Sequence, residues 1–548
     1  MAGTSCCARP RPEIAVEWYC CGRHRFRGNH VSKRYVLALD EGSSSARAIL
    51  VDPDGRIVSE SATPIKARFP STGWVELDPW DLWNAAKGAM DRTMAQAGVT
   101  ASDIAAVGVT THRETCLIWD RQTGQPVYNA IMWMSKQTDD IVARWSADGL
   151  DGQIRARTGL RNDSFFSAGK LAWLLEHVPD VRRRAQLGEL AAGTVETWLL
   201  WNLTGGRSHL TDPSSASRTA LFNIGECKWD EWLCAAYGIP MELLPEVVPS
   251  DSCFGYLDAA VLPGGHAASV PVMAILADQQ AGLFGQACLE AGSAKNTYGT
   301  AGVLTVNVGD APLIVDGMTS SVAWTLGGRT TYEAEGVVFH SGQTLHWLRD
   351  KMRAIDSSES SEALAASVPD NGGVYFVPAF AGLCDPHWDR NVRGAIVGLT
   401  LETGIEHVVR AALEAMAYQT RDNIDALARG GMRIPTLKVD GGGIANDFLC
   451  QFQADILGIA VHRPHGLERT ALGVAHVAGS GVGLWNGADD IAVSWRVERV
   501  FEPAMSETRR EELYAGWQDA VTAARGLPLR KPSSQILPAD NQPLLVAR

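Results

Sequence analysis

The chain has 548 residues, which is too long for one hydrophobic core, so two or more domains are expected. Its net charge of -13 argues against a nucleic-acid-binding surface and against docking on an anionic membrane, although backbone amides and a few arginines can still bind phosphate. No apolar run has the length of a membrane-spanning helix, and the 11 cysteines are odd in number and scattered, so we expect a cytoplasmic protein with reduced thiols.

The two ends of the chain differ in composition from the rest. Residues 1–33 are rich in arginine but lack the apolar core of a secretory signal. Their cysteines, Cys6-Cys7 and Cys20-Cys21, match no standard zinc spacing with His24. We therefore expect a disordered extension rather than a metal site there. Residues 526–548 are rich in proline, serine and glutamine, which predicts a disordered tail.

Regular structure is predicted to begin with a strand over residues 35–40 that ends in Asp40. A turn of glycine and serine over residues 41–45 follows, and a returning strand covers residues 46–52. Such a turn leaves several backbone N–H groups free to face an anion. The alternative is a plain hairpin turn.

A helix is predicted from Asp78-Pro79, since Trp80, Trp83, Ala86, Met90 and Met94 repeat at helical spacing and so form core. A buried strand over residues 104–110 then runs into Arg113 and Glu114. These adjacent charges are either a weak surface ion pair or a pair of ligands for hydroxyl groups, because arginine donates and glutamate accepts.

A helix is also expected over residues 193–205, ended by its last glycine. Further on, the apolar strand 273–277 delivers Asp278 and Gln279 and gives way to small, helix-compatible residues. Asp278 is either the cap of that helix or a ligand-binding acid at the carboxyl end of a strand.

The strand pair expected over residues 293–306 has the same plan as the pair over residues 37–50. Two such turns on two facing domains suit a nucleoside triphosphate. The strand 436–440 then leads through Gly441-Gly442-Gly443 into a helix over residues 447–457, which is a second cradle of the type that binds nucleotides. A long helix is expected before it, over residues 406–428.

These motifs resemble the FGGY carbohydrate kinases, and among them the members that phosphorylate glycerol. The resemblance runs from about Tyr35 to about Trp517. Its two signatures match Phe165-Phe-Ser-Ala-Gly-Lys170-Leu-Ala-Trp173 and, after Gly394-Ala-Ile-Val-Gly398, His407-Val-Val-Arg-Ala-Ala-Leu-Glu414. Arg113-Glu114-Thr115 and Lys295-Asn-Thr-Tyr-Gly-Thr300 also fit.

The resemblance implies an α/β fold of two actin-like, RNase H-like domains, residues 34–287 and 288–525, with the active site in the cleft between them. It implies ATP and Mg²⁺ as cofactors, a small polyol as substrate and a homo-oligomer. Asp278 would be the catalytic base and Asp40 the metal ligand. The polyol would contact Arg113, Glu114, Asp278, Gln279, Phe165, Trp133 and Val303. The nucleotide would contact Ser43, Ser44, Ser45, Arg47, Thr300, Gly342, His346, Gly442 and Asn446.

Two departures from the family pattern touch the polyol. Phe165 stands where a tyrosine contacts glycerol, and Val303 stands where an aromatic ring lines the pocket. Losing one hydrogen bond of this kind costs about 1 kcal/mol. Glu41, His112 and His346 replace glutamines, which we interpret as neutral changes.

The resemblance thus favours ATP-dependent phosphorylation of glycerol. One alternative is a kinase for another short polyol or sugar, such as erythritol or xylitol. The other is a catalytically silent nucleotide sensor on the same fold, which the combination of Asp278, Arg113, Glu114 and Asp40 disfavours.

Overall fold

The computed structural model describes residues 34–262, 270–466 and 468–527. The predictions for residues 1–33 and for the tail beyond residue 527 lie outside this part of the chain. We refer to residues 34–287 as the N-terminal half and to residues 288–527 as the C-terminal half. Both belong to one compact unit.

The N-terminal half is built on a six-stranded sheet with the order β13-β14-β5-β1-β2-β3. The hairpin of β1 and β2 is antiparallel, and β5 and β14 continue the sheet in parallel with β1. Because β1, β5 and β14 are parallel, their carboxyl ends meet at one edge. The strands are β1 (Tyr35–Glu41), β2 (Ser45–Val51), β3 (Ile57–Pro64), β5 (Ile104–Thr111), β13 (Gly255–Tyr256) and β14 (Pro271–Ala277).

The C-terminal half is built on a seven-stranded sheet, β17-β18-β16-β15-β21-β22-β23. Its last six strands repeat the order of the first sheet when that sheet is read from β3 to β13, and β17 is an additional edge strand. Here β15 and β16 form the antiparallel hairpin, and β21 and β22 continue in parallel with β15. The repeat predicted from the two strand pairs is therefore confirmed in the strand order. The strands are β15 (Ala294–Tyr298), β16 (Gly302–Gly309), β17 (Thr319–Leu326), β18 (Arg329–Val338), β21 (Thr436–Asp440), β22 (Ala460–Pro464) and β23 (Val497–Phe501).

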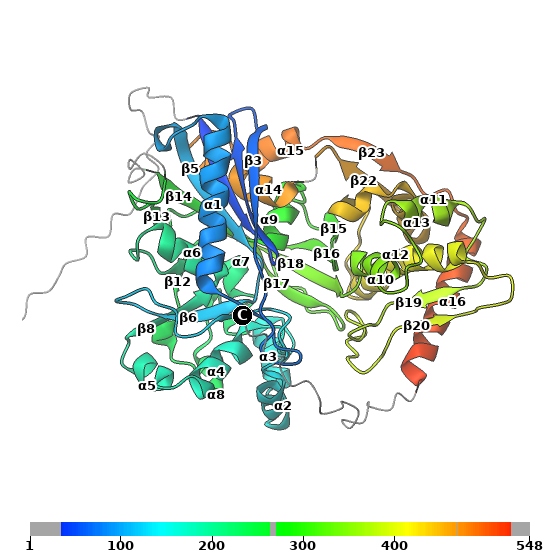
Figure 1. Cartoon of the computed structure of the whole chain (residues 1–548), viewed down its shortest axis with the longest axis horizontal. Coiled ribbons are helices and arrows are strands. Elements are labelled where there is room, and N and C mark those ends of the chain that lie inside the picture. The colour runs from blue at the N-terminus through cyan, green and yellow to red at the C-terminus, as the bar shows by residue number, and fades with distance from the viewer. Residues whose placement is uncertain (1–33, 263–269, 467, 528–548) are drawn as a thin grey trace, which may run out of the picture. The chain divides into compact units, whose positions relative to one another are not determined.

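Two helices join the sheets. In Figure 1, α9 (Asp278–Gly285) and α14 (Arg469–Gly481) lie between the strands of the two halves. They touch backbone to backbone, since a Cβ on Gly285 would lie 1.9 Å from the carbonyl oxygen of Arg469, and one on Gly473 would lie 2.0 Å from that of Ala281. Glycine is required at both positions, and α14 also packs on β5, where a Cβ on Gly108 would lie 2.8 Å from the oxygen of Val474.

A third sheet, in the order β4-β7-β6-β8, also belongs to the N-terminal half. It corrects one prediction: residues 193 and 194 end β8 rather than start a helix, because Gly193 pairs with Leu117 of β6. The helix is α6 (Val195–Leu203), and it ends before the glycines. The strands are β4 (Glu76–Leu77), β6 (Cys116–Asp120), β7 (Ala130–Ile131) and β8 (Leu190–Thr194).

The other predicted helices are confirmed. Asp78 caps α1 (Pro79–Ala97) by accepting from the backbone N–H of Trp80. Ala86, Met90 and Met94 form the buried face of this helix. The remaining helices of the N-terminal half are α2 (Asp139–Ala147), α3 (Asp151–Thr158), α4 (Ser167–His177), α5 (Val181–Gln186), α7 (Pro213–Ala216) and α8 (Glu231–Tyr237). Those of the C-terminal half are α10 (Gly342–Asp350), α11 (Ser360–Ala366), α12 (Ile405–Arg429), α13 (Asp447–Leu457), α15 (Ala488–Ser494) and α16 (Glu507–Gly526).

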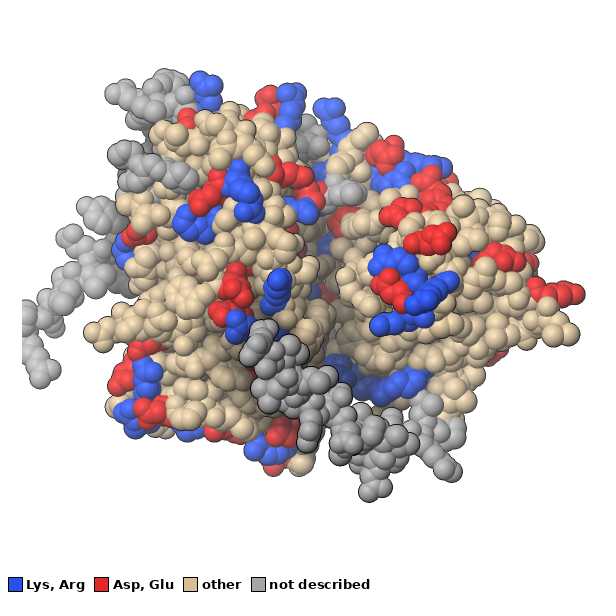
Figure 2. Space-filling model, in the orientation of Figure 1, with Lys and Arg blue, Asp and Glu red and all other residues tan. Residues whose placement is uncertain are grey.

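Short strand pairs complete the fold: β9 (Leu210–Thr211) with β12 (Glu246–Val247), β10 (Phe222–Asn223) with β11 (Lys228–Trp229), and β19 (Tyr375–Val377) with β20 (Ala395–Val397). Every cysteine in the described ranges is free, as expected of reduced thiols. Among the described helices, none combines the length and apolarity needed to cross a bilayer. Acidic and basic side chains are interspersed on the face drawn in Figure 2.

Candidate active site

Asp278 lies where β14 ends and α9 begins. It is the first residue of α9, and Ala277 occupies the capping position. One carboxylate oxygen of Asp278 accepts from the backbone N–H of Gln279 at 2.7 Å and lies 3.1 Å from Nε of Arg113. A quarter of the side chain is exposed. The carboxylate is therefore paired with a cation and still accessible from one side.

Arg113 and Glu114 follow β5, which is the neighbour of β14, so both strands deliver charged groups to the same edge. Glu114 has a left-handed backbone with φ of 66°, a conformation that costs a non-glycine residue about 1 kcal/mol or more and that clusters at functional sites. Its Oε1 lies 3.9 Å from Nε of Arg113 and accepts from Nε of Arg218 at 2.7 Å. All three side chains are buried.

Two glutamates of β18 extend this cluster from the C-terminal half. Glu335 accepts from Nη1 of Arg113 at 2.5 Å and from Nη2 of Arg218 at 2.8 Å. Glu333 accepts from Gln280 at 2.7 Å and Ser321 at 2.8 Å. Burial and then the charge of Glu335 raise the pKa of Glu333 to about 7. Burial also acts to raise the pKa of Glu335, but the two arginines outweigh it and hold that pKa below its ordinary value.

Gln279 is oriented by a buried lysine. Lys295, on β15, donates to Oε1 of Gln279 at 2.5 Å and to Oγ1 of Thr297 at 2.7 Å. A carboxamide whose oxygen is bound to an ammonium group has its N–H₂ left to donate elsewhere. The C-terminal half thus fixes which end of Gln279 can face a ligand.

Phe165 lies against Trp133, with ring centroids 5.4 Å apart in an edge-to-face arrangement. The segment that carries Phe165 is held by Lys170, whose buried ammonium donates to the carbonyls of Ser164 at 2.8 Å, Phe165 at 2.6 Å and Phe166 at 2.9 Å. All three protons of the ammonium group are used. Lys170 therefore fixes the backbone at Phe165.

Val303, the third apolar residue predicted to line the polyol site, lies on β16 opposite Val337 and is buried. The structure places it on the sheet that contributes Lys295 and Glu335.

The first phosphate-type turn joins β1 to β2. The N–H of Gly42 donates to the carbonyl of Ser45 at 2.9 Å, and the indole of Trp133 donates to Oγ of Ser43 at 2.8 Å, which links this turn to Phe165. Arg47 forms an ion pair with Glu468, which precedes α14. Ser44 and Ser45 complete the turn with Gly42 and Ser43.

Asp40 is the next-to-last residue of β1 and lies directly opposite Arg47. Burial and then the charge of Asp278 raise the pKa of Asp40 to about 7. A buried carboxyl group with a second carboxylate near it is a suitable ligand for a divalent cation. Within the described residues no group of three or more His, Cys, Asp or Glu side chains could hold a metal.

The second phosphate-type turn, at Thr300, contacts the start of α10. The carbonyl of Thr300 accepts from the N–H groups of Ser341 at 3.1 Å and Gln343 at 3.2 Å. Gly342 packs against this turn so closely that a Cβ would lie 2.8 Å from the oxygen of Gly299. The predicted pair Thr300 and Gly342 is thus brought together.

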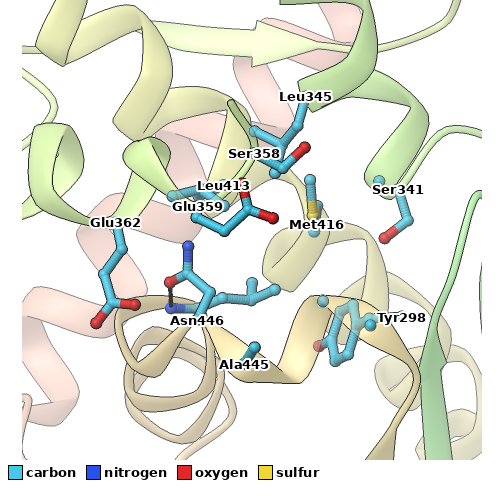
Figure 3. Close-up of a pocket in the computed structure, with 14 residues that line it drawn as sticks. Tyr298, Ser341, Leu345, Ser358, Glu359, Glu362, Leu413, Met416, Ala445 and Asn446 are labelled. Carbon is cyan, nitrogen blue, oxygen red and sulfur yellow. Dashed lines mark hydrogen bonds between the residues drawn. The ribbon is translucent and has the colours of Figure 1, made fainter. Parts of the chain in front are cut away.

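A cavity of about 150 Å³ opens beside this turn. Figure 3 shows Ser341 and Tyr298 at one end of it and Glu362 and Asn446 at the other, with Glu359 between them. Apolar side chains from α10, α12 and α13 complete the lining: Leu345, Leu413, Met416 and Leu449. This size and lining suit a flat heterocycle rather than a whole nucleotide.

Three predicted nucleotide residues, Gly342, Gly442 and Asn446, line the cavity, whereas His346 does not. Asn446 also caps α13 by accepting from the N–H of Leu449 at 2.9 Å. A Cβ on Gly442 would meet no protein atom within 4 Å, so the space beside it belongs to the cavity. This open side at Gly442 is the feature that fits a bound nucleotide.

Sequence reasoning missed Arg218, Gln280, Glu333 and Glu335, and gave Lys170 and Lys295 no role although both lie in its motifs. A signal for two of them was present. Glutamates two apart in a strand share a face, and a buried strand does not carry two on one face without cationic partners. The identity of those partners depends on which strands pair, and the sequence alone does not reveal it.

Comparison with known proteins places these residues in a family. Residues 35–285 match the N-terminal domain of the FGGY family of carbohydrate kinases, and residues 294–482 match its C-terminal domain. The chain is 49% identical over 497 residues to a glycerol kinase of Carboxydothermus hydrogenoformans, covering 90% of this chain and 99% of that one. It is 48% identical to a glycerol kinase of Symbiobacterium thermophilum, again over 90% of this chain and 99% of the other.

Solved structures agree with the sequence comparison. A glycerol kinase from Plasmodium falciparum with ADP superimposes with a TM-score of 0.84 at 31% identity, covering 89% of this chain and 98% of that one. A xylulose kinase from Lactobacillus acidophilus has a TM-score of 0.80 at 20% identity, over 90% of this chain and 98% of the other, and shares the fold. The chain belongs to the FGGY family of carbohydrate kinases.

Proposed function

We propose that this chain transfers the γ-phosphoryl group of ATP to a primary hydroxyl of glycerol, giving glycerol 3-phosphate and ADP. The observation that carries the proposal is the cluster of Asp278, Arg113 and Glu114 at the shared edge of β5 and β14. The similarity to glycerol kinases over nine-tenths of the chain supports the choice of substrate.

Each residue type suits its proposed role. Asp278 accepts the proton of the attacking hydroxyl as its oxygen bonds to the γ-phosphorus, while the bond from that phosphorus to the bridging oxygen of ADP breaks. Arg113 donates to the hydroxyls of the polyol, Glu114 accepts from them, and Gln279 donates through the N–H₂ that Lys295 leaves available. Phe165, Trp133 and Val303 pack around the carbon chain.

The nucleotide extends from the β1–β2 turn to the cavity of the C-terminal half. Ser43, Ser44, Ser45, Arg47 and Thr300 contact its phosphates, with Arg47 exchanging Glu468 for phosphate. Gly342, Gly442 and Asn446 enclose the adenosine. Asp40 would hold Mg²⁺, and the ion would neutralise charge on the phosphates.

A second candidate substrate is a longer polyol such as erythritol or xylitol. It is favoured by Phe165, which lacks the hydroxyl expected for glycerol, and by Val303, which fills less space than a ring. The proposal also includes a homo-oligomer in the cytoplasm, and light scattering measures the oligomeric state.

A panel of polyols assayed for ATP-dependent release of ADP tests the substrate. We expect the largest kcat/KM with glycerol. Turnover of erythritol or xylitol without turnover of glycerol would replace the substrate and keep the reaction. An absence of turnover on every polyol would contradict the proposed reaction and favour a silent nucleotide sensor.

A further inference from the structure

We infer that Glu335 is a positioning residue which, from the C-terminal half, holds the polyol-binding side chains of the N-terminal half in place; the inference rests on the proposed function. Its two carboxylate oxygens divide between two guanidinium groups. One accepts from Arg113 at 2.5 Å, and the other accepts from Arg218 at 2.8 Å. Glu335 thereby clamps both arginines at once.

Each arginine also pairs with a carboxylate of the proposed polyol site. Arg113 directs its Nε to Asp278 at 3.1 Å while its Nη1 is held by Glu335. Arg218 directs its Nε to Glu114 at 2.7 Å while its Nη2 is held by Glu335. Because a guanidinium is planar, fixing one edge of it fixes the direction of the other. Glu335 therefore sets the orientation of both contacts.

The position of Glu335 in the second sheet explains how it can contact arginines of the N-terminal half. Thr305 of β16 lies opposite Glu335 and also opposite Lys295 of β15, so Glu335 and Lys295 share one face of the second sheet. This face meets α9, since Lys295 bonds to Gln279 and Glu333 bonds to Gln280. The N-terminal half thus supplies the groups that touch the polyol, and this face of the C-terminal half orients them.

Burial makes the clamp strong. Glu335 is fully buried, and Arg218 is 1% exposed. Removing one partner of a buried, hydrogen-bonded ion pair leaves the other charge without compensation. Neutralising Glu335 would remove one of the anchors of each buried guanidinium group, which would leave Arg113 held by Asp278 and Arg218 held by Glu114 with less fixed directions.

Glu333 provides a matched control on the same strand and the same face. It lies 3.9 Å from Nη1 of Arg113, and its hydrogen bonds go instead to Gln280 and Ser321. Neither of those residues belongs to the proposed polyol site. A change at Glu333 therefore alters the charge of this face while the clamp stays intact.

The test compares Glu335→Gln with Glu333→Gln and the wild type in steady-state kinetics with both substrates varied. We expect Glu335→Gln to raise the KM for glycerol about 10-fold or more and to leave the KM for ATP within about 2-fold. Glu333→Gln, which keeps both hydrogen bonds of Glu335, should raise the KM for glycerol clearly less than Glu335→Gln does. Glu335→Asp, which keeps the charge, should recover part of the loss.

If Glu335→Gln does not fold, Arg218→Lys gives the same information. Lysine keeps the charge but has no second donor edge, so it should also raise the KM for glycerol and spare the KM for ATP. A folded Glu335→Gln or Arg218→Lys with an unchanged KM for glycerol, or with both KM values raised equally, would overturn the inference. The comparison uses whichever polyol the wild type phosphorylates, so failure on glycerol alone would reject only the proposed substrate.

Discussion

Phe165 is the residue that bears most directly on which polyol this kinase binds. Its ring packs on Trp133, and its backbone is fixed by Lys170, so the position of a para-hydroxyl is determined by the surrounding chain. A tyrosine at this site would bring an oxygen toward the polyol without moving the segment.

We predict that Phe165→Tyr lowers the KM for glycerol about 5-fold, which corresponds to one added hydrogen bond of about 1 kcal/mol. The KM for ATP should change less, because Phe165 is linked to the phosphate-type turn indirectly, through Trp133. Steady-state kinetics with both substrates measures this. An unchanged KM for glycerol would mean that the polyol binds away from this ring.

Glu333 makes the stability of the protein depend on pH. Its carboxyl group faces Glu335, Arg113 and Arg218, and its pKa is raised from 4.5 to about 7. A carboxyl group with a raised pKa stabilises the folded state fully below pH 4.5, and that contribution is lost as the pH rises through 7.

Glu333→Gln removes this titration. We predict that the free energy of unfolding of the variant, relative to wild type, increases by about 2–3 kcal/mol between pH 5 and pH 8. Urea denaturation at the two pH values measures the difference, in which titrating groups distant from Glu333 cancel. A difference that is the same at both pH values would show that Glu333 does not change its protonation state there.

At the scale of elements, the glycine turn between β21 and α13 combines two different requirements. Gly441 has φ of 86°, and a Cβ there would lie 2.6 Å from the carbonyl oxygen of Tyr298, so it is needed for folding. Gly442 has open space beside it and lines the cavity, so it is needed for the ligand.

We therefore predict that Gly442→Ala raises the KM for ATP about 10-fold, because its methyl group enters the cavity, and leaves the melting temperature unchanged. Gly441→Ala should instead lower the melting temperature. Thermal denaturation and ATP kinetics on both variants separate the two effects. Normal ATP kinetics in Gly442→Ala would place the nucleotide outside this cavity.

The elements that the sequence predicted correctly are those with a strong local pattern. The strand 436–440 and the helix 447–457 have the predicted bounds because a glycine turn and an asparagine cap separate them. The prediction failed at residues 193–194, where pairing with β6 overrides the helical character of the sequence that follows. Asp278 and Arg113 could be singled out as candidates because each follows a buried strand with a strong local pattern, and their roles stay predictions. Glu335 was missed because its role exists only between β18 and a loop 222 residues away.

At the scale of the whole molecule, the repeated sheets have unequal tasks. The edge of the first sheet carries Arg113, Glu114 and Asp278, which are proposed to act on the polyol. The second sheet contributes the nucleotide cavity on one side and, through Glu335 and Lys295, the groups that orient the polyol site. Close backbone contacts between α9 and α14 hold the two sheets against each other.

Asp278 is proposed as the base for phosphoryl transfer to the polyol, and the substitution Asp278→Asn removes that base. Asparagine keeps the shape of the side chain but cannot accept the hydroxyl proton at that oxygen. Asp54→Asn is the control, because Asp54 is an exposed residue in the turn between β2 and β3. We predict that Asp278→Asn lowers kcat about 100-fold or more while ATP still binds with wild-type affinity, measured by calorimetry on the same preparation. A kcat within a few-fold of wild type would contradict the assignment of Asp278 as the base.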